Sequence, residues 1–199
     1  MPQNHEIRKM SREALARNWG TAILACILVL IFTGIIPNIL SDDYGFILIL
    51  LISGPFDFGL AFFFLTLIRE KKSDINNIFS GFKLFGQTLG LFIVMLVFII
   101  LWSLLLIIPG IIAAYSYSMA FFIMVDNKDI TVMDAIRQSK TMMYGHKTRL
   151  FTLHLSFLGW ILLSIISCGI GFVWVGPYIK TAQAIFYNEL KNESFKKIE

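Results

Sequence analysis

Charged residues are scarce in this sequence. Only 15% of its 199 residues are Asp, Glu, Lys or Arg, and 57% are hydrophobic, whereas a soluble domain has about 25% charged residues. This composition excludes an ordinary water-soluble globular protein and predicts an all-α polytopic membrane protein. A membrane-spanning helix needs about 20 apolar residues. The chain therefore has room for six spans but not for a separate catalytic domain.

Cysteines and catalytic motifs are also scarce. Cys26 and Cys168 lack metal-type spacing, so we expect neither a disulfide framework nor a metal site. The sequence has no HExxH, no phosphate-binding glycine loop and no GxSxG, which leaves an enzyme or a cofactor without support. The first apolar run is too long for a signal-peptide core and no small-x-small cleavage site follows it, which indicates a retained anchor.

Long charge-free runs predict the spans. The run between Arg17 and Asp42 has 24 residues without charge. The run between Asp43 and Arg69 has 25 residues, of which only Asp57 is charged. The 42-residue run after Lys83 would extend about 63 Å as one helix, so it must form two spans. The last run, residues 150–179, fits one tilted span or parts of two, and we favour two. The predicted spans are Thr21–Leu40, Phe46–Ile68, two helices in 84–125 that turn at Pro109 and Gly110, and two in 150–190 that turn at 168–171.

The positions of the basic residues predict the orientation. A six-span topology places residues 1–20, 69–86, 126–149 and 191–199 on one side of the membrane, and these segments hold 16 of the 17 Lys and Arg residues. The charged residues in the predicted outer turns are both acidic, Asp42 and Asp43. By the positive-inside rule both termini are then cytoplasmic. The net charge of +4 is explained by orientation in a membrane, and we expect no nucleic-acid partner.

A short amphipathic stretch precedes each predicted hairpin. Residues 7–14, 75–82 and 131–142 have apolar stripes at helical period, typical of helices that lie in the membrane interface. Ser73 or Asp74 is the expected N-cap of the second stretch. The chain is one domain, 1–199, that divides into possible parallel repeats over residues 1–68, 69–126 and 127–199. Parallel repeats occur in transporters, but duplication also produces helical scaffolds without transport.

Three ionisable residues lie at predicted membrane depth, where charge is expensive and often functional. Asp57 and Lys180 can meet between the second and sixth spans, either as a structural ion pair or as a proton-sensitive or ion-coupled site. Lys180 could alternatively extend to the interface. His154 is expected to make an interhelical hydrogen bond or to relay protons. Pro55 and Pro177 precede the two charges and free backbone carbonyls nearby.

The sequence resembles a family of bacterial polytopic membrane proteins catalogued as domain of unknown function nine-seven-five, over nearly the whole chain. The resemblance rests on Gly54, Pro55 and Gly59; Phe79, Gly81 and Phe82; Leu101, Trp102, Pro109 and Gly110; Ala135, Ile136 and Ser139; Met143, Gly145, His146 and Lys147; Leu150, Phe151, Ser156, Gly159 and Trp160; and Pro177, Tyr178, Phe186, Tyr187 and Leu190. It implies an integral bacterial membrane protein without a catalytic domain. Asp57 and Lys180 are not part of the family pattern.

Two functions of different class remain open. The first is a non-enzymatic, permease-like or lipid- or peptide-handling protein that acts through Asp57, Lys180 and His154. The second is a structural or regulatory scaffold that docks a partner through the cytoplasmic-face helices, with Lys71, Lys72 and Arg137 at the contact. An intramembrane enzyme is a weaker third. The expected partners are the lipid bilayer and either further copies of the chain or another membrane subunit.

Overall fold

The computed structural model describes residues 2–40, 45–72, 74–167 and 169–196. Every regular element in these ranges is helical. The elements are α1 (Asn4–Leu15), α2 (Trp19–Leu30), the π-helix η1 (Ile31–Ile35), α3 (Ile36–Leu40), α4 (Gly45–Glu70), the 3₁₀ helix η2 (Ile75–Leu84), α5 (Phe85–Leu105), α6 (Ile107–Tyr117), α7 (Ala120–Asp126), α8 (Val132–Met142), α9 (Lys147–Leu155), α10 (Leu158–Ile166) and α11 (Phe172–Lys196). The all-α prediction is confirmed. Asp42, Asp43, Ser73 and Cys168 lie outside the described residues.

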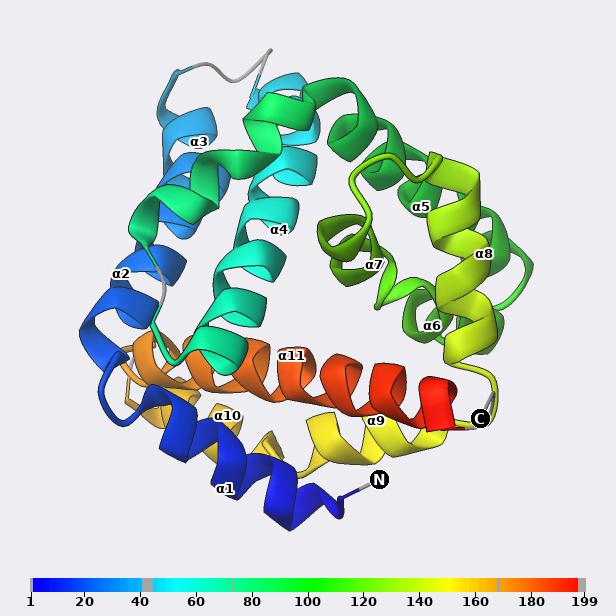
Figure 1. The fold of residues 1–199 in the computed structure, drawn as a ribbon. Coiled ribbons are helices and arrows are strands. Elements are labelled where there is room, and N and C mark those ends of the chain that lie inside the picture. The colour runs from blue at the N-terminus through cyan, green and yellow to red at the C-terminus, as the bar shows by residue number, and fades with distance from the viewer. Residues whose placement is uncertain (1, 41–44, 73, 168, 197–199) are drawn as a thin grey trace.

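Helices α4 and α11 form the centre of the molecule. Figure 1 shows α11 running across the fold, with α4 ending against it, α2 and α3 on one side of α4, and α5 to α8 on the other. Helices α1, α9 and α10 lie along α11 (Figure 1). Phe63, Phe64, Phe186 and Tyr187 are almost fully buried. The two central helices thus bury these four large aromatic side chains where they meet the rest of the fold.

Four helical segments are long and apolar enough to cross a membrane: residues 45–70, 75–105, 107–126 and 147–166. A fifth is reached if α1 and the helix from Trp19 to Ile35 count as one span bent by 98°. Helix α11 has the length of a span, but Lys180, Gln183 and Glu189 lower its hydropathy. The structure therefore has four or five helical segments that are long and apolar enough to span a membrane. The sixth span remains a prediction.

The turn predicted at Pro109 and Gly110 lies elsewhere. The chain breaks at Leu106, which has an extended conformation (φ −163°, ψ 148°), and both predicted turn residues belong to α6. Proline is tolerated in the first turn of a helix, where its missing N–H has no intrahelical acceptor. Pro109 therefore helps to begin α6 rather than to end α5.

The three short amphipathic stretches are helical, as predicted. The second is a 3₁₀ helix rather than an α-helix, and its N-cap is Asp74, which accepts a hydrogen bond from the backbone N–H of Asn76 at 3.0 Å. This bond and a second from the Asn76 side chain lower the pKa of Asp74. Thr131 caps α8 through the Asp134 N–H. Gly145, with φ +79°, lies in the turn after α8.

Helices α4 and η2 approach each other at the level of the backbone. A Cβ atom on Gly59 would overlap the carbonyl of Ile78, and one on Gly81 would overlap the carbonyl of Pro55. A Cβ atom on Gly54 would come within 2.5 Å of the carbonyl oxygen of Thr88. These positions accept only glycine, because any side chain would force the two elements apart. The glycines therefore fix how η2 and α5 lie on α4.

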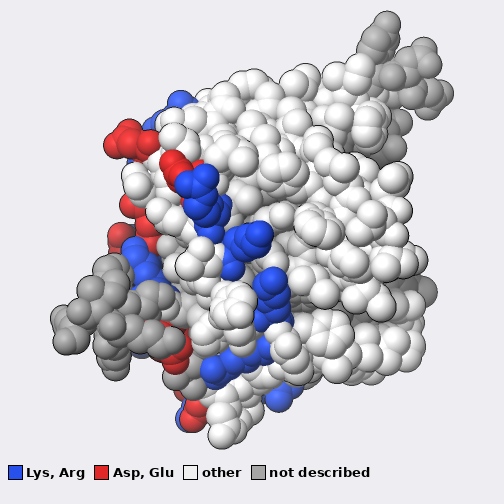
Figure 2. Space-filling model, turned by 90° about the vertical axis from the view of Figure 1, so that its right-hand side faces the viewer, with Lys and Arg blue, Asp and Glu red and all other residues white. Residues whose placement is uncertain are grey.

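Charged side chains collect along one edge of the molecule. Figure 2 shows Lys, Arg, Asp and Glu in a band on that edge and almost none over the rest of the face in view. An apolar surface beside a charged edge is the distribution expected for helices whose sides contact lipid and whose ends contact water. Large apolar residues are exposed on α5, α6 and α10, including Leu104, Ile107 and Ile166.

Candidate functional site

The structure places Asp57 and Lys180 on the walls of one cavity of about 180 Å³. Asp57 belongs to α4 and Lys180 to α11, and both side chains are partly buried. Gln183 and Ser118 supply further polar groups, and most other lining residues are apolar. The cavity therefore combines a carboxylate, an ammonium group, an amide and a hydroxyl within a largely apolar wall.

Prolines precede both charges on their helices. Pro55 lies inside α4 and Pro177 inside α11, where a proline removes one backbone hydrogen bond and frees a carbonyl. The carbonyl of Pro177 itself accepts a hydrogen bond from the Thr181 hydroxyl at 2.8 Å. Local departures from regular helix near intramembrane charges are the way in which many transporters form their sites.

Asp57 and Lys180 are close but form no direct contact. Among the described residues, no ion pair or hydrogen bond joins the two side chains, although the Lys180 charge is near enough to act on Asp57 electrostatically. The predicted ion pair is therefore not formed in this structure, although both residues line the same cavity.

His154 is not among the residues that line the cavity. It lies on α9, and its Nδ1 is 3.2 Å from the hydroxyl of Tyr115 on α6, with the ring centroids 5.7 Å apart. This contact is the interhelical hydrogen bond that the sequence suggested for an intramembrane histidine. Proton relay by His154 and a common site for the three residues remain predictions, while Asp57 and Lys180 line the same cavity.

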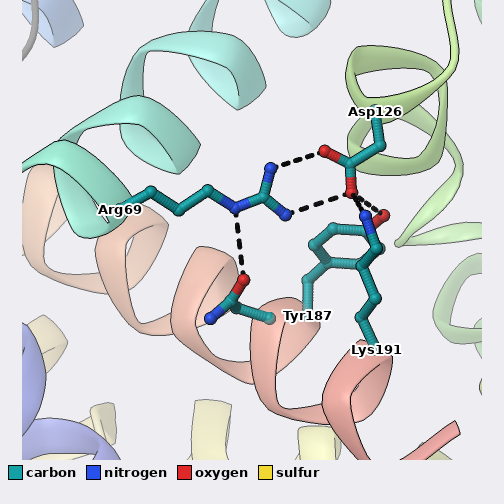
Figure 3. Close-up of polar contacts among 5 residues, drawn as sticks. Arg69, Asp126, Tyr187 and Lys191 are labelled. Atoms are coloured by element: carbon teal, nitrogen blue, oxygen red, sulfur yellow. Dashed lines mark hydrogen bonds and ion pairs between the residues drawn. The ribbon is translucent and has the colours of Figure 1, made fainter. Parts of the chain in front are cut away.

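A second polar site joins the ends of three helices. Figure 3 shows Asp126 at the end of α7, Arg69 near the end of α4, and Tyr187 and Lys191 on α11. The Arg69 guanidinium donates to both carboxylate oxygens of Asp126, at 2.6 and 3.1 Å. The Tyr187 hydroxyl and the Lys191 ammonium donate to Oδ2, at 2.7 and 2.5 Å. We call these four residues the Asp126 cluster.

The Asp126 cluster is connected to the cavity by stacked aromatic rings. Phe122 lines the cavity and stacks on Tyr187, with centroids 5.3 Å apart and an interplanar angle of 21°. Phe122 precedes Asp126 by one helical turn, about 6 Å along the helix axis. The stacked rings therefore link a residue of the cavity wall to the Asp126 cluster, in which Tyr187 donates a hydrogen bond to Asp126.

Sequence reasoning did not identify the Asp126 cluster. Arg69 and Lys191 were assigned to the positive-inside pattern, and Asp126 only marked the end of a charge-free run. Arg69, Asp126 and Lys191 follow the second, fourth and sixth predicted spans, respectively. This shared position could have identified the cluster from the sequence, because equivalent ends of parallel repeats can converge. No group of three or more potential metal ligands occurs within the described ranges.

The comparisons with known proteins identify a family and no function. Two overlapping matches to one family model, described as a protein of unknown function (DUF975), cover residues 1–114 and 93–194. No curated protein and no solved structure matches the chain. Because the two matches together include nearly every residue, the resemblance found from the sequence is confirmed. The chain belongs to the DUF975 family of proteins of unknown function.

Proposed function

We propose that this protein is a non-enzymatic, permease-like protein of the bacterial cytoplasmic membrane that binds a small zwitterionic solute in the Asp57–Lys180 cavity. In this proposal α11 and the helix from Trp19 complete six spans, the hairpins are arranged as parallel repeats, and both termini are cytoplasmic. The observation that carries the proposal is the presence of Asp57 and Lys180 on the walls of one cavity without an ion pair between them among the described residues.

The energetic argument concerns these charges. A charge held in a low-dielectric interior is costly unless a partner of opposite sign contacts it. Asp57 and Lys180 would satisfy each other in a direct pair, but the structure leaves them apart. A molecule with one ammonium and one carboxylate group would pair with both residues at once, and Gln183 could donate or accept a further hydrogen bond.

The cavity volume restricts the solute. A volume of 180 Å³ is the space of about six water molecules at the density of the liquid, and it is below the range of roughly 300–1,000 Å³ typical of drug-sized ligands. The site therefore suits a solute of a few heavy atoms, such as a small amino acid. Larger lipids or peptides do not fit this cavity.

The proposal predicts solute binding that depends on Asp57. With purified protein in lipid nanodiscs, isothermal titration of glycine, alanine and β-alanine should detect binding of at least one of them. Asp57→Asn should weaken that binding at least 10-fold, because it removes the partner of the solute ammonium group. Alanine uptake by proteoliposomes should fall in parallel.

A matched variant and a stability measurement distinguish the alternatives. Asp129→Asn removes an exposed carboxylate outside the cavity and should leave binding unchanged. If none of the zwitterions binds and Asp57→Asn only lowers the thermal stability, the two charges have a structural role and the permease proposal is wrong. If a copurified protein is instead released by charge reversal at Lys71, Lys72 and Arg137, the scaffold function replaces it.

The topology can be tested separately. We expect alkaline phosphatase fused after Glu199 to be inactive and a green fluorescent protein fused at the same place to be fluorescent, because the six-span topology places the C-terminus in the cytoplasm. The opposite pattern would leave an odd number of spans and would exclude α11 as the sixth. A fusion within residues 41–45 should give the reverse result and serves as the control.

A further inference from the structure

A second cavity, larger than the proposed solute site, lies at a different place in the molecule. It has a volume of about 560 Å³. Its walls are formed by α1 and the residues that follow it, by the end of α4, and by α11. We call it the α1 cavity. Its volume is within the range of roughly 300–1,000 Å³ typical of small-molecule sites, so it can hold a much larger group than the Asp57–Lys180 cavity.

The α1 cavity is lined by two acidic and two basic side chains. They are Glu13, Arg17, Lys71 and Glu189. Within the described parts of the chain, none of the four side chains forms an ion pair or a hydrogen bond with another residue. The cavity therefore offers two cationic and two anionic groups, with equal numbers of each sign, to an outside ligand.

Apolar residues complete the wall. Met10 and Ala14 come from α1, Leu67 and Ile68 from α4, and Ile185 from α11. Helix α1 buries Ile7 and Leu15 while its charged residues stay near the surface, as in helices that lie in the membrane interface. The α1 cavity thus combines charges of both signs with apolar surface beside an amphipathic helix, the combination that an amphiphile requires.

Lys71 is held at the α1 cavity in a costly conformation. It has a φ of +58°, the one positive φ of a non-glycine residue in the described ranges, and this left-handed conformation is unfavourable for a residue with a Cβ atom. The Asn18 side chain donates a hydrogen bond of 3.1 Å to the Lys71 carbonyl, and Asn18 also lines the cavity. The strained turn directs the chain from α4 around the cavity rim.

We infer that the α1 cavity binds a phospholipid whose headgroup carries a phosphate and a primary amine, as in phosphatidylethanolamine. Arg17 and Lys71 face the phosphate, because guanidinium and ammonium groups bind phosphate oxygens through charge-assisted hydrogen bonds. Glu13 and Glu189 accept hydrogen bonds from the amine. The apolar wall contacts the glycerol and the first part of the acyl chains. This site is independent of the proposed solute site.

Native mass spectrometry of the full chain in detergent tests this inference with named probes. We expect palmitoyl-oleoyl phosphatidylethanolamine to bind at least 10-fold more tightly than the phosphatidylglycerol and phosphatidylcholine with the same acyl chains. Phosphatidylglycerol has no amine, and the quaternary ammonium of phosphatidylcholine has no N–H to donate. The double variant Arg17→Gln/Lys71→Gln should weaken binding of all three lipids, because each carries a phosphate.

The acidic residues provide the specific test. Glu13→Gln/Glu189→Gln should reduce the preference for phosphatidylethanolamine over phosphatidylglycerol to about one, whereas the control variant Asp129→Asn/Lys140→Gln, at exposed residues outside the α1 cavity, should keep it. An equal affinity of the native protein for the two lipids would overturn the inference, as would an unchanged preference in the acidic double variant. Binding of free O-phosphoethanolamine as tightly as the lipid would also overturn it in favour of a soluble ligand.

Discussion

Gly59→Ala is expected to lower the free energy of unfolding by about 3 kcal/mol or more, the upper part of the range for overpacking. The new Cβ atom would overlap the backbone carbonyl of Ile78, which cannot change rotamer as a side chain can. Helix α4 and η2 must then move apart, and the contacts of Phe56 with Phe79 and Phe82 are lost with them. Equilibrium unfolding in mixed detergent and dodecyl sulfate micelles measures the change.

The matched control for this variant is Gly86→Ala. Gly86 is also helical, in α5, but a Cβ atom there would have no neighbour within 4 Å. We expect its free energy of unfolding to rise or to stay within about 1 kcal/mol, because alanine has the higher helix propensity. If Gly59→Ala and Gly86→Ala unfold at the same mole fraction of dodecyl sulfate, the backbones of α4 and η2 are not in close contact and this prediction is wrong.

Asp126→Ala is expected to cost about 2–3 kcal/mol of stability. The change leaves Arg69 and Lys191 without their shared carboxylate and removes the acceptor of the Tyr187 hydroxyl. Breaking a fully buried ion pair costs about 3–5 kcal/mol. The effect here is smaller because 34% of the Arg69 side chain and 31% of the Lys191 side chain are exposed, so water replaces part of the lost interaction.

A double-mutant cycle assigns this loss to the Asp126 cluster. Arg69→Ala and Asp126→Ala together should cost less than the sum of the single variants, with a coupling of about 1 kcal/mol or more. Arg137→Ala is the control: its ion pair with Asp134 is 3.4 Å long and exposed on the surface, so its removal should cost less than about 1 kcal/mol. Additive effects of Arg69 and Asp126 would show that the cluster does not stabilise the bundle.

The Asp126 cluster also bears on the proposed function. It joins the ends of α4, α7 and α11, and the same three helices carry Asp57, Phe122 and Lys180 of the cavity. A movement of α7 relative to α11 would separate Phe122 from Tyr187, whose rings stack on each other. Asp126 variants that retain folded protein should therefore alter solute exchange more than solute affinity.

Helix positions and short-range features were predictable from the sequence. The charge-free runs located α4 as Phe46–Ile68 against the observed Gly45–Glu70, and the capping pattern at Thr131 located the start of α8. These features depend on residues within one or two turns of one another. The sequence predicts the turn at Pro109 and Gly110 because proline followed by glycine is typical of turns, but proline fits equally well in the first turn of a helix, and the chain breaks at Leu106.

The sequence by itself determined that this is a helical chain with membrane-length apolar segments and a charged edge, because hydropathy and charge act locally along the chain. Only the tertiary structure decided which polar groups meet. The partners of Asp126 are 57, 61 and 65 residues away, and the walls of the α1 cavity come from three separate elements. Such contacts depend on how α4, α7 and α11 pack against one another, and that packing is determined by side chains that lie far apart in the sequence.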